Sequence, residues 1–192
     1  MRTAIALTLL LLGTAHADPE VATVQVLRDG VGGDGSGAVF KADKGVSYVL
    51  TNRHVAPAGS RVYKVRSAGK VYDAEWVAAS ADSDLALLRV RAALVSVPLA
   101  DAEPAPGTAV RAYGYGGFPK AGTVVGADQF GARLPGTGDI WRLSFQPEPG
   151  DSGSPVIADG KLVGILWGTA GYRDFRTCAV RLSDIKAFLK GK

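Results

Sequence analysis

The sequence has little histidine, little cysteine and only one long apolar run. Each of these shortages excludes a class of structure or site. It contains two histidines and one cysteine in 192 residues. One histidine lies near the N-terminus, where Arg2 precedes the apolar run Ala4 to Leu12 and the small-x-small site Ala15 to Ala17. This pattern predicts a signal peptide over residues 1–17, with Asp18 as the mature N-terminus. The run is shorter than the ~20 apolar residues that span a bilayer, so we expect no stable membrane anchor.

The single cysteine, Cys178, cannot form a disulfide within one chain, so the exported product must rely on packing and strand pairing. Its alternating apolar context predicts a small buried residue rather than a nucleophile. One histidine and one cysteine in the mature chain are too few for a typical metal site, and we expect neither metal nor cofactor. The net charge of +4, or +3 without Arg2, includes no run of Lys or Arg, which argues against nucleic-acid binding.

Short runs of β-branched and alternating residues recur along the mature chain, separated by Gly, Pro and Asp, as in all-β sandwiches and barrels. Residues 98–107 are rich in Pro and predict a crossover between barrel-like halves of about 18–97 and 108–180. Ser183 is the predicted N-cap of a short helix that ends the second half. The predicted strands are residues 21–28, 37–41, 47–51, 61–66, 70–77, 85–90, 108–113, 123–126, 140–145, 155–158, 162–167 and 176–180.

Three blocks hold the residue types that activate a hydroxyl nucleophile. His54 ends a predicted strand, Asp84 precedes Leu-Ala-Leu-Leu, and Ser152 lies within Gly-Asp-Ser-Gly-Ser-Pro. A serine hydroxyl needs a base to take its proton, and histidine is the side chain whose ordinary pKa suits that role near neutrality. Glycine at position 150 also lets its own N–H and that of Ser152 point at a developing oxyanion. Because the three blocks divide between the two halves, such a site must lie in the cleft between them.

In the order His, Asp, Ser, these blocks resemble those of the trypsin-like serine peptidases of the chymotrypsin fold. The resemblance is greatest to the disulfide-free bacterial branch, which includes the glutamyl endopeptidases and the Deg-type protease domains. The matching segments are Gly-Ser-Gly-Ala-Val-Phe at 35–40, Leu-Thr-Asn-Arg-His-Val at 50–55, Asp-Leu-Ala-Leu-Leu at 84–88, Gly-Asp-Ser-Gly-Ser-Pro-Val at 150–156 and Val-Gly-Ile-Leu-Trp-Gly at 163–168.

The resemblance implies a fold of two six-stranded antiparallel barrels with a C-terminal helix, domain limits of 18–192, and polypeptide substrates. It makes Ser152 the nucleophile, His54 the general base and then acid, and Asp84 the acceptor that orients the histidine. Asp82 is a rival acid two residues earlier, but the family motif places the acid directly before Leu-Ala-Leu. Gly150 and Ser152 would form the oxyanion hole.

The specificity positions depart from the glutamyl endopeptidases and from the trypsins. Leu166 stands where the former have a carboxylate-reading histidine, Pro147 where a small hydroxyl residue is common, and Gln146 near the position of the trypsin acid. We therefore expect a neutral or apolar pocket for the P1 side chain, the one preceding the scissile bond. The late strand is expected to pair with an extended peptide; alternatively, Leu166 and Trp167 are core residues. The predicted substrate-binding residues are Gln146, Pro147, Leu166, Trp167, Gly168 and Thr169.

Two further features have open interpretations. The resemblance implies that Asp151 pairs with a buried amino terminus or another local donor. The amine freed at Asp18 is one candidate, and a solvent-exposed terminus is the alternative. The segment Tyr113 to Pro119 is rich in glycine, but neither a Lys-Ser/Thr pair nor a helix follows it. This favours a structural turn over a phosphate-binding loop.

Together these features predict an exported serine endopeptidase, secreted or periplasmic, that works as a monomer. A protease-like binding module that has lost turnover is the first alternative, although no triad residue is missing from the sequence. An esterase that uses the same triad is the second alternative.

Overall fold

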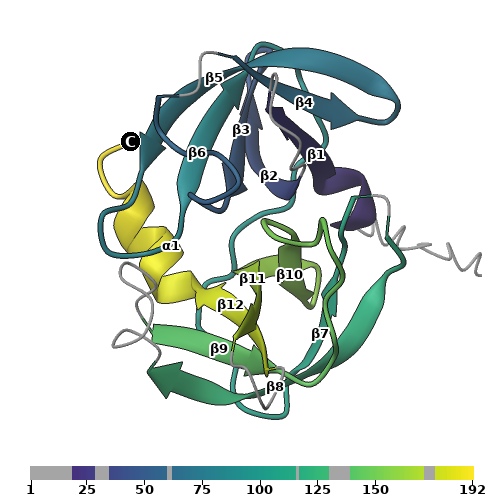
Figure 1. Ribbon diagram of the computed structural model, residues 1–192, viewed down its shortest axis with the longest axis vertical. Helices are drawn as coiled ribbons and strands as arrows, with labels where there is room; N and C mark the ends of the chain where they lie inside the picture. The colour runs from purple at the N-terminus through teal and green to yellow at the C-terminus, as the bar shows by residue number, and fades with distance from the viewer. Residues whose placement is uncertain (1–18, 29–34, 60–61, 116, 130–138, 171–175) are drawn as a thin grey trace, which may run out of the picture.

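The computed structural model describes residues 19–28, 35–59, 62–115, 117–129, 139–170 and 176–192. The chain forms two closed six-stranded antiparallel barrels, one above the other in Figure 1, with a single α-helix after the last strand. The predicted all-β fold of two six-stranded barrels with a C-terminal helix is therefore confirmed. The predicted signal peptide over residues 1–17, and Asp18 after it, lie outside the described residues.

The first barrel orders its strands β1-β2-β3-β6-β5-β4, and the second β10-β11-β12-β9-β8-β7. A 3₁₀ turn, η1 (Pro19–Ala22), precedes the first strand. The strands of the first barrel are β1 (Thr23–Arg28), β2 (Gly35–Asp43), β3 (Val46–Thr51), β4 (Tyr63–Ser67), β5 (Lys70–Ala79) and β6 (Ala86–Val90). Those of the second are β7 (Ala109–Ala112), β8 (Lys120–Gln129), β9 (Asp139–Leu143), β10 (Pro155–Ala158), β11 (Lys161–Ala170) and β12 (Arg176–Arg181).

Each barrel is filled by side chains that alternate along its strands. In β4, Tyr63, Val65 and Ser67 are buried while the two residues between them are partly exposed, which is the period of two expected of a strand with one face on a core. The interior of the first barrel contains mainly Val24, Val26, Val39, Val49, Val65 and Leu88. That of the second contains mainly Val110, Val124, Leu143, Val156, Leu166 and Ala179.

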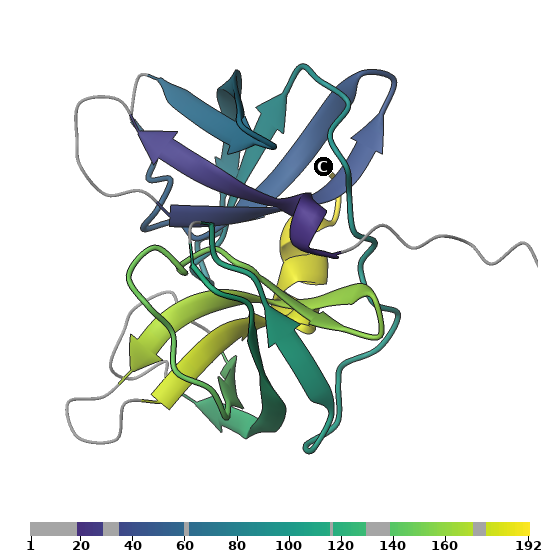
Figure 2. The same ribbon diagram turned by 90° about the vertical axis from the view of Figure 1, so that its right-hand side faces the viewer.

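A third apolar cluster joins the two barrels. It combines Leu50 and Leu87 from the first barrel with Ile157 and Ile165 from the second and with Phe188 from the helix α1 (Leu182–Leu189). Figure 2 shows α1 at the junction between the barrels. Each fully buried Leu or Ile side chain contributes about 1.5–3 kcal/mol. The shared core therefore holds the barrels in one relative position, as a site divided between them requires.

The connection from β6 to β7 runs along both barrels. The N–H of Val97 donates to Val39 O at 2.9 Å in the first barrel, and the N–H of Ala100 donates to Leu162 O at 2.9 Å in the second. The N–H of Leu162 donates in turn to Pro98 O at 2.8 Å. This segment therefore adds backbone hydrogen bonds to the contact between the barrels.

The helix begins differently from the sequence prediction, whereas Cys178 lies as predicted. The N-cap position is Arg181, and Ser183 lies in the first turn, where its N–H donates to Glu103 Oε1 at 2.7 Å. The Ser183 cap prediction is therefore wrong, because a carboxylate from the barrel connection satisfies a free N–H at the helix start. Cys178 is fully buried beside Ile140, as its alternating context predicted.

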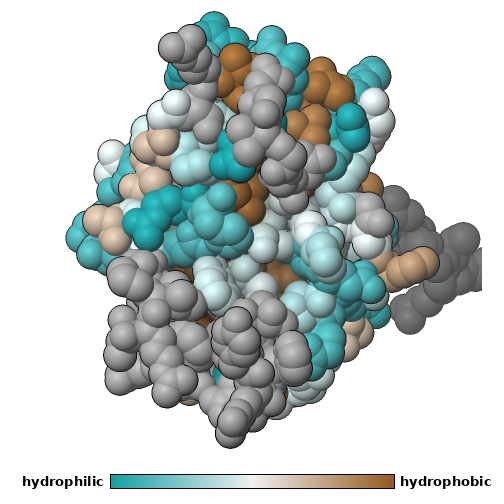
Figure 3. Space-filling model, in the orientation of Figure 1, coloured by the Kyte–Doolittle hydropathy of each residue, from teal (hydrophilic) through white to brown (hydrophobic). Residues whose placement is uncertain are grey.

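The face drawn in Figure 3 is largely hydrophilic, with apolar residues visible mainly over the first barrel. Within the residues that the structure describes, no helix combines the length and the hydropathy needed to cross a membrane.

Candidate functional site

A cleft of about 790 Å³ lies between the barrels and receives side chains from both. His54 and Asp84 come from the first barrel, Ser152 from the second. The three residues that the sequence predicted to act together therefore border one cavity, although 98 positions separate the histidine from the serine. The remaining lining residues are Arg53, Pro57, Ala58, Ala79, Pro147, Glu148, Pro149, Gly150, Trp167 and Gly168.

Two hydrogen bonds hold His54 against Asp84. The ring Nδ1 lies 2.5 Å from Asp84 Oδ2, and the backbone N–H of His54 donates to Asp84 Oδ1 at 3.0 Å. The Asp84 side chain is 7% exposed, whereas that of His54 is 46% exposed. A buried carboxylate facing Nδ1 favours the proton on that nitrogen, which leaves Nε2 as the acceptor. The pair thus has the arrangement of a histidine prepared to accept a proton at Nε2.

The turn before β6 determines which aspartate meets the histidine. Ser80 Oγ accepts hydrogen bonds from the N–H of Asp82 at 3.2 Å and of Ser83 at 3.1 Å. The turn leaves Asp82 exposed and buries Asp84. Asn52, two residues before the histidine, donates from Nδ2 to Asp84 O at 3.0 Å and ties the end of β3 to this turn. Asp84 therefore contacts His54, and Asp82 does not line the cleft.

The serine is held by the late strand of the second barrel. Ser152 Oγ donates to Trp167 O at 3.1 Å, and among the described residues it makes no hydrogen bond with His54. The Trp167 ring meets the His54 ring edge-on, with centroids 6.3 Å apart and an angle of 75° between the ring planes. The serine hydroxyl thus rests on a β11 carbonyl beside the histidine. Catalytic hydrogen bonds are often long or unmade in free enzymes, so this geometry is compatible with a nucleophile.

The backbone of the serine loop provides two unused donors. The N–H groups of Asp151, Gly153 and Ser154 donate to Glu148 O, Leu166 O and Asp151 O at 2.8–3.0 Å. Within the described chain, the N–H groups of Gly150 and Ser152 donate to no other group. Gly150 has a φ of 95°, a left-handed conformation that favours glycine. Two free N–H groups beside a serine hydroxyl are suited to stabilising a negatively charged oxygen.

The loop passes so close to the first barrel that position 153 must be glycine. Its φ is 89°, and a Cβ there would lie 2.0 Å from Ser36 O and 2.5 Å from Thr51 Oγ1. The N–H of Ser36 donates to Ser152 O at 2.7 Å, and Ser36 Oγ donates to Gly150 O at 2.8 Å. The Gly-Ser-Gly strand of the first barrel thus orients two carbonyls of the serine loop.

The predicted substrate-binding residues divide into two groups. Pro147, Trp167 and Gly168 line the cleft. Leu166 is fully buried in the core of the second barrel, and Gln146 is exposed without lining the cleft. The side chain of Thr169 lies outside the described part of the structure.

Sequence reasoning missed several cleft residues. Arg53, Glu148 and Pro149 adjoin His54, Pro147 and Gly150 in the sequence, so adjacency was an available signal for them. Ala79, at the end of β5, reaches the cleft only through the folding of the first barrel, and nothing in its local sequence indicates this.

Comparisons with known proteins agree with this fold. The family model for the trypsin-like peptidase domain matches residues 35–165. The serine protease Rv3671c of Mycobacterium tuberculosis (strain H37Rv) is 33% identical over 150 residues, which are 71% of this chain and 36% of that protein. The periplasmic pH-dependent serine endoprotease DegQ of Escherichia coli K12 is 29% identical over 141 residues, which are 69% of this chain and 30% of that protein. The chain thus spans about a third of the length of these relatives.

Solved structures give the same relationship in three dimensions. The crystal structure of Rv3671c protease, inactive form, aligns with a TM-score of 0.73 at 26% identity and covers 90% of this chain and 89% of that one. The crystal structure of the serine endoprotease from Yersinia pestis shares the fold, with a TM-score of 0.73, 22% identity and coverage of 90% and 62%. The resemblance of the sequence to bacterial trypsin-like serine peptidases is confirmed: the chain belongs to the trypsin-like peptidase domain family.

Proposed function

We propose that this protein is a serine endopeptidase that cleaves peptide bonds through an acyl-enzyme on Ser152. The observation that carries the proposal is the convergence at one cleft of Ser152, the hydrogen-bonded pair His54 and Asp84, and two N–H groups without acceptors. Membership of a family that includes serine proteases supports it.

The reaction begins with a rotation of the Ser152 hydroxyl from Trp167 O to His54 Nε2. The oxygen attacks the substrate carbonyl carbon while its proton passes to Nε2, and Asp84 stabilises the charged ring. The N–H groups of Gly150 and Ser152 then donate to the carbonyl oxygen as it becomes negative. His54 returns the proton to the leaving amine, which departs and leaves an ester on Ser152. Water, activated by the same histidine, hydrolyses that ester and restores the serine.

The peptide would lie along β11. Trp167 O, which accepts from Ser152 in the free protein, is placed to accept an N–H of an extended substrate, and this exchange would release the hydroxyl for reaction. Gly168 has a φ of 130°, and a Cβ there would lie 3.7 Å from Ser152 Oγ, so the missing side chain keeps the approach open.

We further propose a neutral or apolar preference for the residue before the scissile bond. Pro147, Pro149 and Trp167 contribute apolar walls to the cleft. The two charged side chains beside them already have partners, because Arg53 Nη1 donates to Ser80 O at 2.8 Å and Glu148 Oε2 accepts from Lys120 at 3.1 Å.

We also propose that residues 1–17 direct export to the periplasm or beyond the cell, and that the protein is a monomer.

Digestion of a peptide library by the protein from residue 18 onwards, with Ser152→Ala as the matched control, tests this function. We expect cleavage by the unmodified protein only, mainly after neutral or apolar residues. Cleavage mainly after Glu or Lys would contradict the pocket assignment. Hydrolysis of small esters without any peptide cleavage would favour the esterase, and no turnover of either class would favour the binding module.

A further inference from the structure

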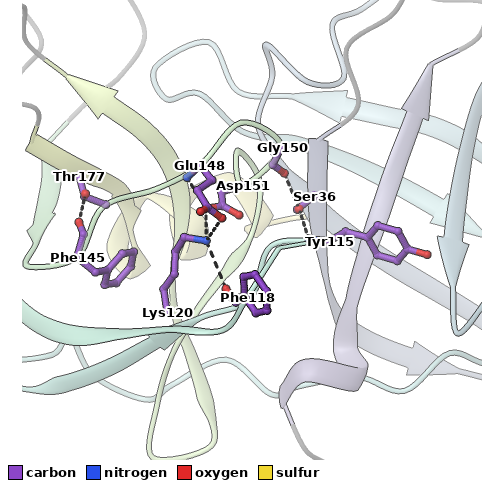
Figure 4. Close-up of polar contacts among 9 residues, drawn as sticks. All are labelled: Ser36, Tyr115, Phe118, Lys120, Phe145, Glu148, Gly150, Asp151 and Thr177. Atoms are coloured by element: carbon purple, nitrogen blue, oxygen red, sulfur yellow. Dashed lines mark hydrogen bonds and ion pairs between the residues drawn. The ribbon is translucent and has the colours of Figure 1, made fainter.

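A second carboxylate, that of Asp151, is buried directly behind the nucleophile. Its side chain is 3% exposed, and Oδ2 accepts a hydrogen bond from the N–H of Glu148 at 2.7 Å and lies 2.9 Å from Lys120 Nζ (Figure 4). Burial of a carboxylate is costly unless a positive group and hydrogen bonds compensate it. Lys120 supplies that positive group from the first position of β8, 31 residues earlier in the sequence.

The lysine side chain is also largely enclosed. Its side chain is 10% exposed, and Nζ contacts Asp151 Oδ2, Glu148 Oε2 at 3.1 Å and Phe118 O at 3.3 Å. These acceptors match the three protons of an ammonium group. Burial alone would lower the pKa of Lys120, but the hydrogen bonds to the two carboxylates together raise it above its ordinary value. The ammonium group therefore stays charged throughout the neutral range.

The glycine-rich segment around Gly114 makes room for this ion pair. A Cβ at Gly114 would lie 1.8 Å from Asp151 Oδ1, a distance that no real contact permits. The N–H of Tyr115 donates to Ser36 Oγ at 2.9 Å, and the same hydroxyl donates to Gly150 O (Figure 4). The segment that the sequence identified only as a turn therefore packs against both the buried carboxylate and the oxyanion loop.

We propose that Lys120 is the positioning residue of the nucleophile loop. By holding Asp151 and Glu148, its ammonium group fixes the turn from Glu148 to Ser152 in the conformation that leaves the N–H groups of Gly150 and Ser152 free at the cleft. The partner of Asp151 comes from within the second barrel, so activity does not require a charged chain terminus at Asp18. This inference rests on the proposed function, because it concerns the same oxyanion donors.

The test compares Lys120→Met, which keeps an unbranched side chain one atom shorter and without its charge, with Lys120→Arg, which keeps the charge. Loss of one oxyanion donor lowers kcat by about 10²–10³-fold. We expect a loss of about that size in Lys120→Met with less than a fivefold change in KM, and recovery of at least a tenth of the original kcat in Lys120→Arg. A folded Lys120→Met protein with kcat within twofold of the original would overturn the proposal, as would equal losses in both variants.

A lone buried carboxylate could unfold the Lys120→Met protein, so the double variant Lys120→Met with Asp151→Asn, which removes both charges, gives a second measurement. We expect it to fold and to have a kcat at least 30-fold below that of the original protein; a folded double variant with full kcat would contradict the positioning role.

Reaction of the original protein with a fluorophosphonate distinguishes failure of the proposed function from failure of the role of Lys120. No reaction would contradict the proposed function, whereas a reactive unmodified protein with an equally reactive Lys120→Met variant would contradict only the role of Lys120.

An extension of the chain tests the statement about the terminus. A protein starting at Asp18 and the same protein preceded by an uncleavable ten-residue tag should have the same kcat within twofold. A tenfold loss caused by the tag would show that Lys120 does not suffice.

Discussion

The two halves of the cleft are built in different ways. In the first barrel, His54 and Asp84 bind each other directly through two hydrogen bonds, and each lies within three residues of a strand end. In the second barrel, Ser152 lies on a turn that is bound by Lys120 through Asp151 and that packs against Gly114, and neither Lys120 nor Gly114 lines the cleft. Direct contact thus fixes the proposed acid–base pair, whereas we propose that packing outside the cleft and one buried ion pair fix the nucleophile and the oxyanion donors.

This difference predicts two kinds of mutational response. Removing a group that contacts the reacting atoms should abolish the chemistry without disturbing the fold. Removing a support behind the nucleophile should lower both the rate and the free energy of unfolding, because the buried carboxylate is then left uncompensated.

The largest expected effects come from the reacting groups. Ser152→Ala and His54→Ala should each lower kcat by about 10⁶-fold, since residues of such a unit fail together when one is lost. Both side chains are partly exposed, so the unfolding temperature should stay within a few degrees of the original. Peptide hydrolysis and thermal unfolding of the two variants measure this, and turnover retained by both would end the triad assignment.

The acid of the first barrel gives the next largest effect. Asp84→Asn should lower kcat by about 10⁴-fold, because an amide facing Nδ1 no longer favours the tautomer with a free Nε2. Asp82→Asn is the matched control, since Asp82 is exposed and lies outside the cleft, and its kcat should change less than twofold. Equal losses in the two variants would show that the turn as a whole, rather than the contact with His54, is what matters.

A glycine behind the nucleophile tests the second half of the comparison. Gly114→Ala should lower kcat/KM by about ten- to a hundredfold and the free energy of unfolding by about 1–3 kcal/mol, because the new Cβ displaces Asp151. Gly126→Ala in β8 is the control, since a Cβ there meets nothing within 4 Å. Steady-state kinetics and urea unfolding measure both quantities, and a neutral Gly114→Ala would mean that the loop does not need this support.

The last and smallest effect is the change with pH in the stability that Lys120 contributes. Because the folded-state pKa of Lys120 is raised above 10.5, its ion pair with Asp151 and Glu148 contributes its full stability below pH ~10.5, and the contribution declines as pH rises through the folded pKa. Removing one partner of a buried pair costs about 3–5 kcal/mol. The difference in unfolding free energy between the original protein and Lys120→Met should therefore be constant from pH 7 to 9 and narrow above pH ~10.5. A difference that narrows below pH 9 would contradict this assignment.

The strands were predicted well from the sequence where buried and exposed residues alternate. They were predicted less well where pairing with a neighbouring strand extends a strand through residues of low β-propensity. Strand β8 begins at Lys120 rather than at 123, because Ala112 of β7 pairs with Lys120 although Ala and Gly in between have low β-propensity. The helix start was misassigned because its acceptor, Glu103, is 80 residues away.

The same distinction applies to the site. His54, Asp84 and Ser152 could be found because their neighbours in sequence form recognisable blocks. Lys120 could not, because a single lysine after a Gly-Gly-Phe-Pro stretch has many possible roles, and only the tertiary structure brings its Nζ to Asp151. Leu166 was assigned from a relative's pocket, yet its position on β11 faces the barrel interior.

Mapping the site of fluorophosphonate modification by mass spectrometry tests most directly whether Ser152 is the nucleophile. We expect a single adduct on Ser152 in the original protein, no adduct in Ser152→Ala, and strongly slowed formation in His54→Ala. If the folded original protein forms no adduct, or forms it on another residue, Ser152 is not the activated nucleophile.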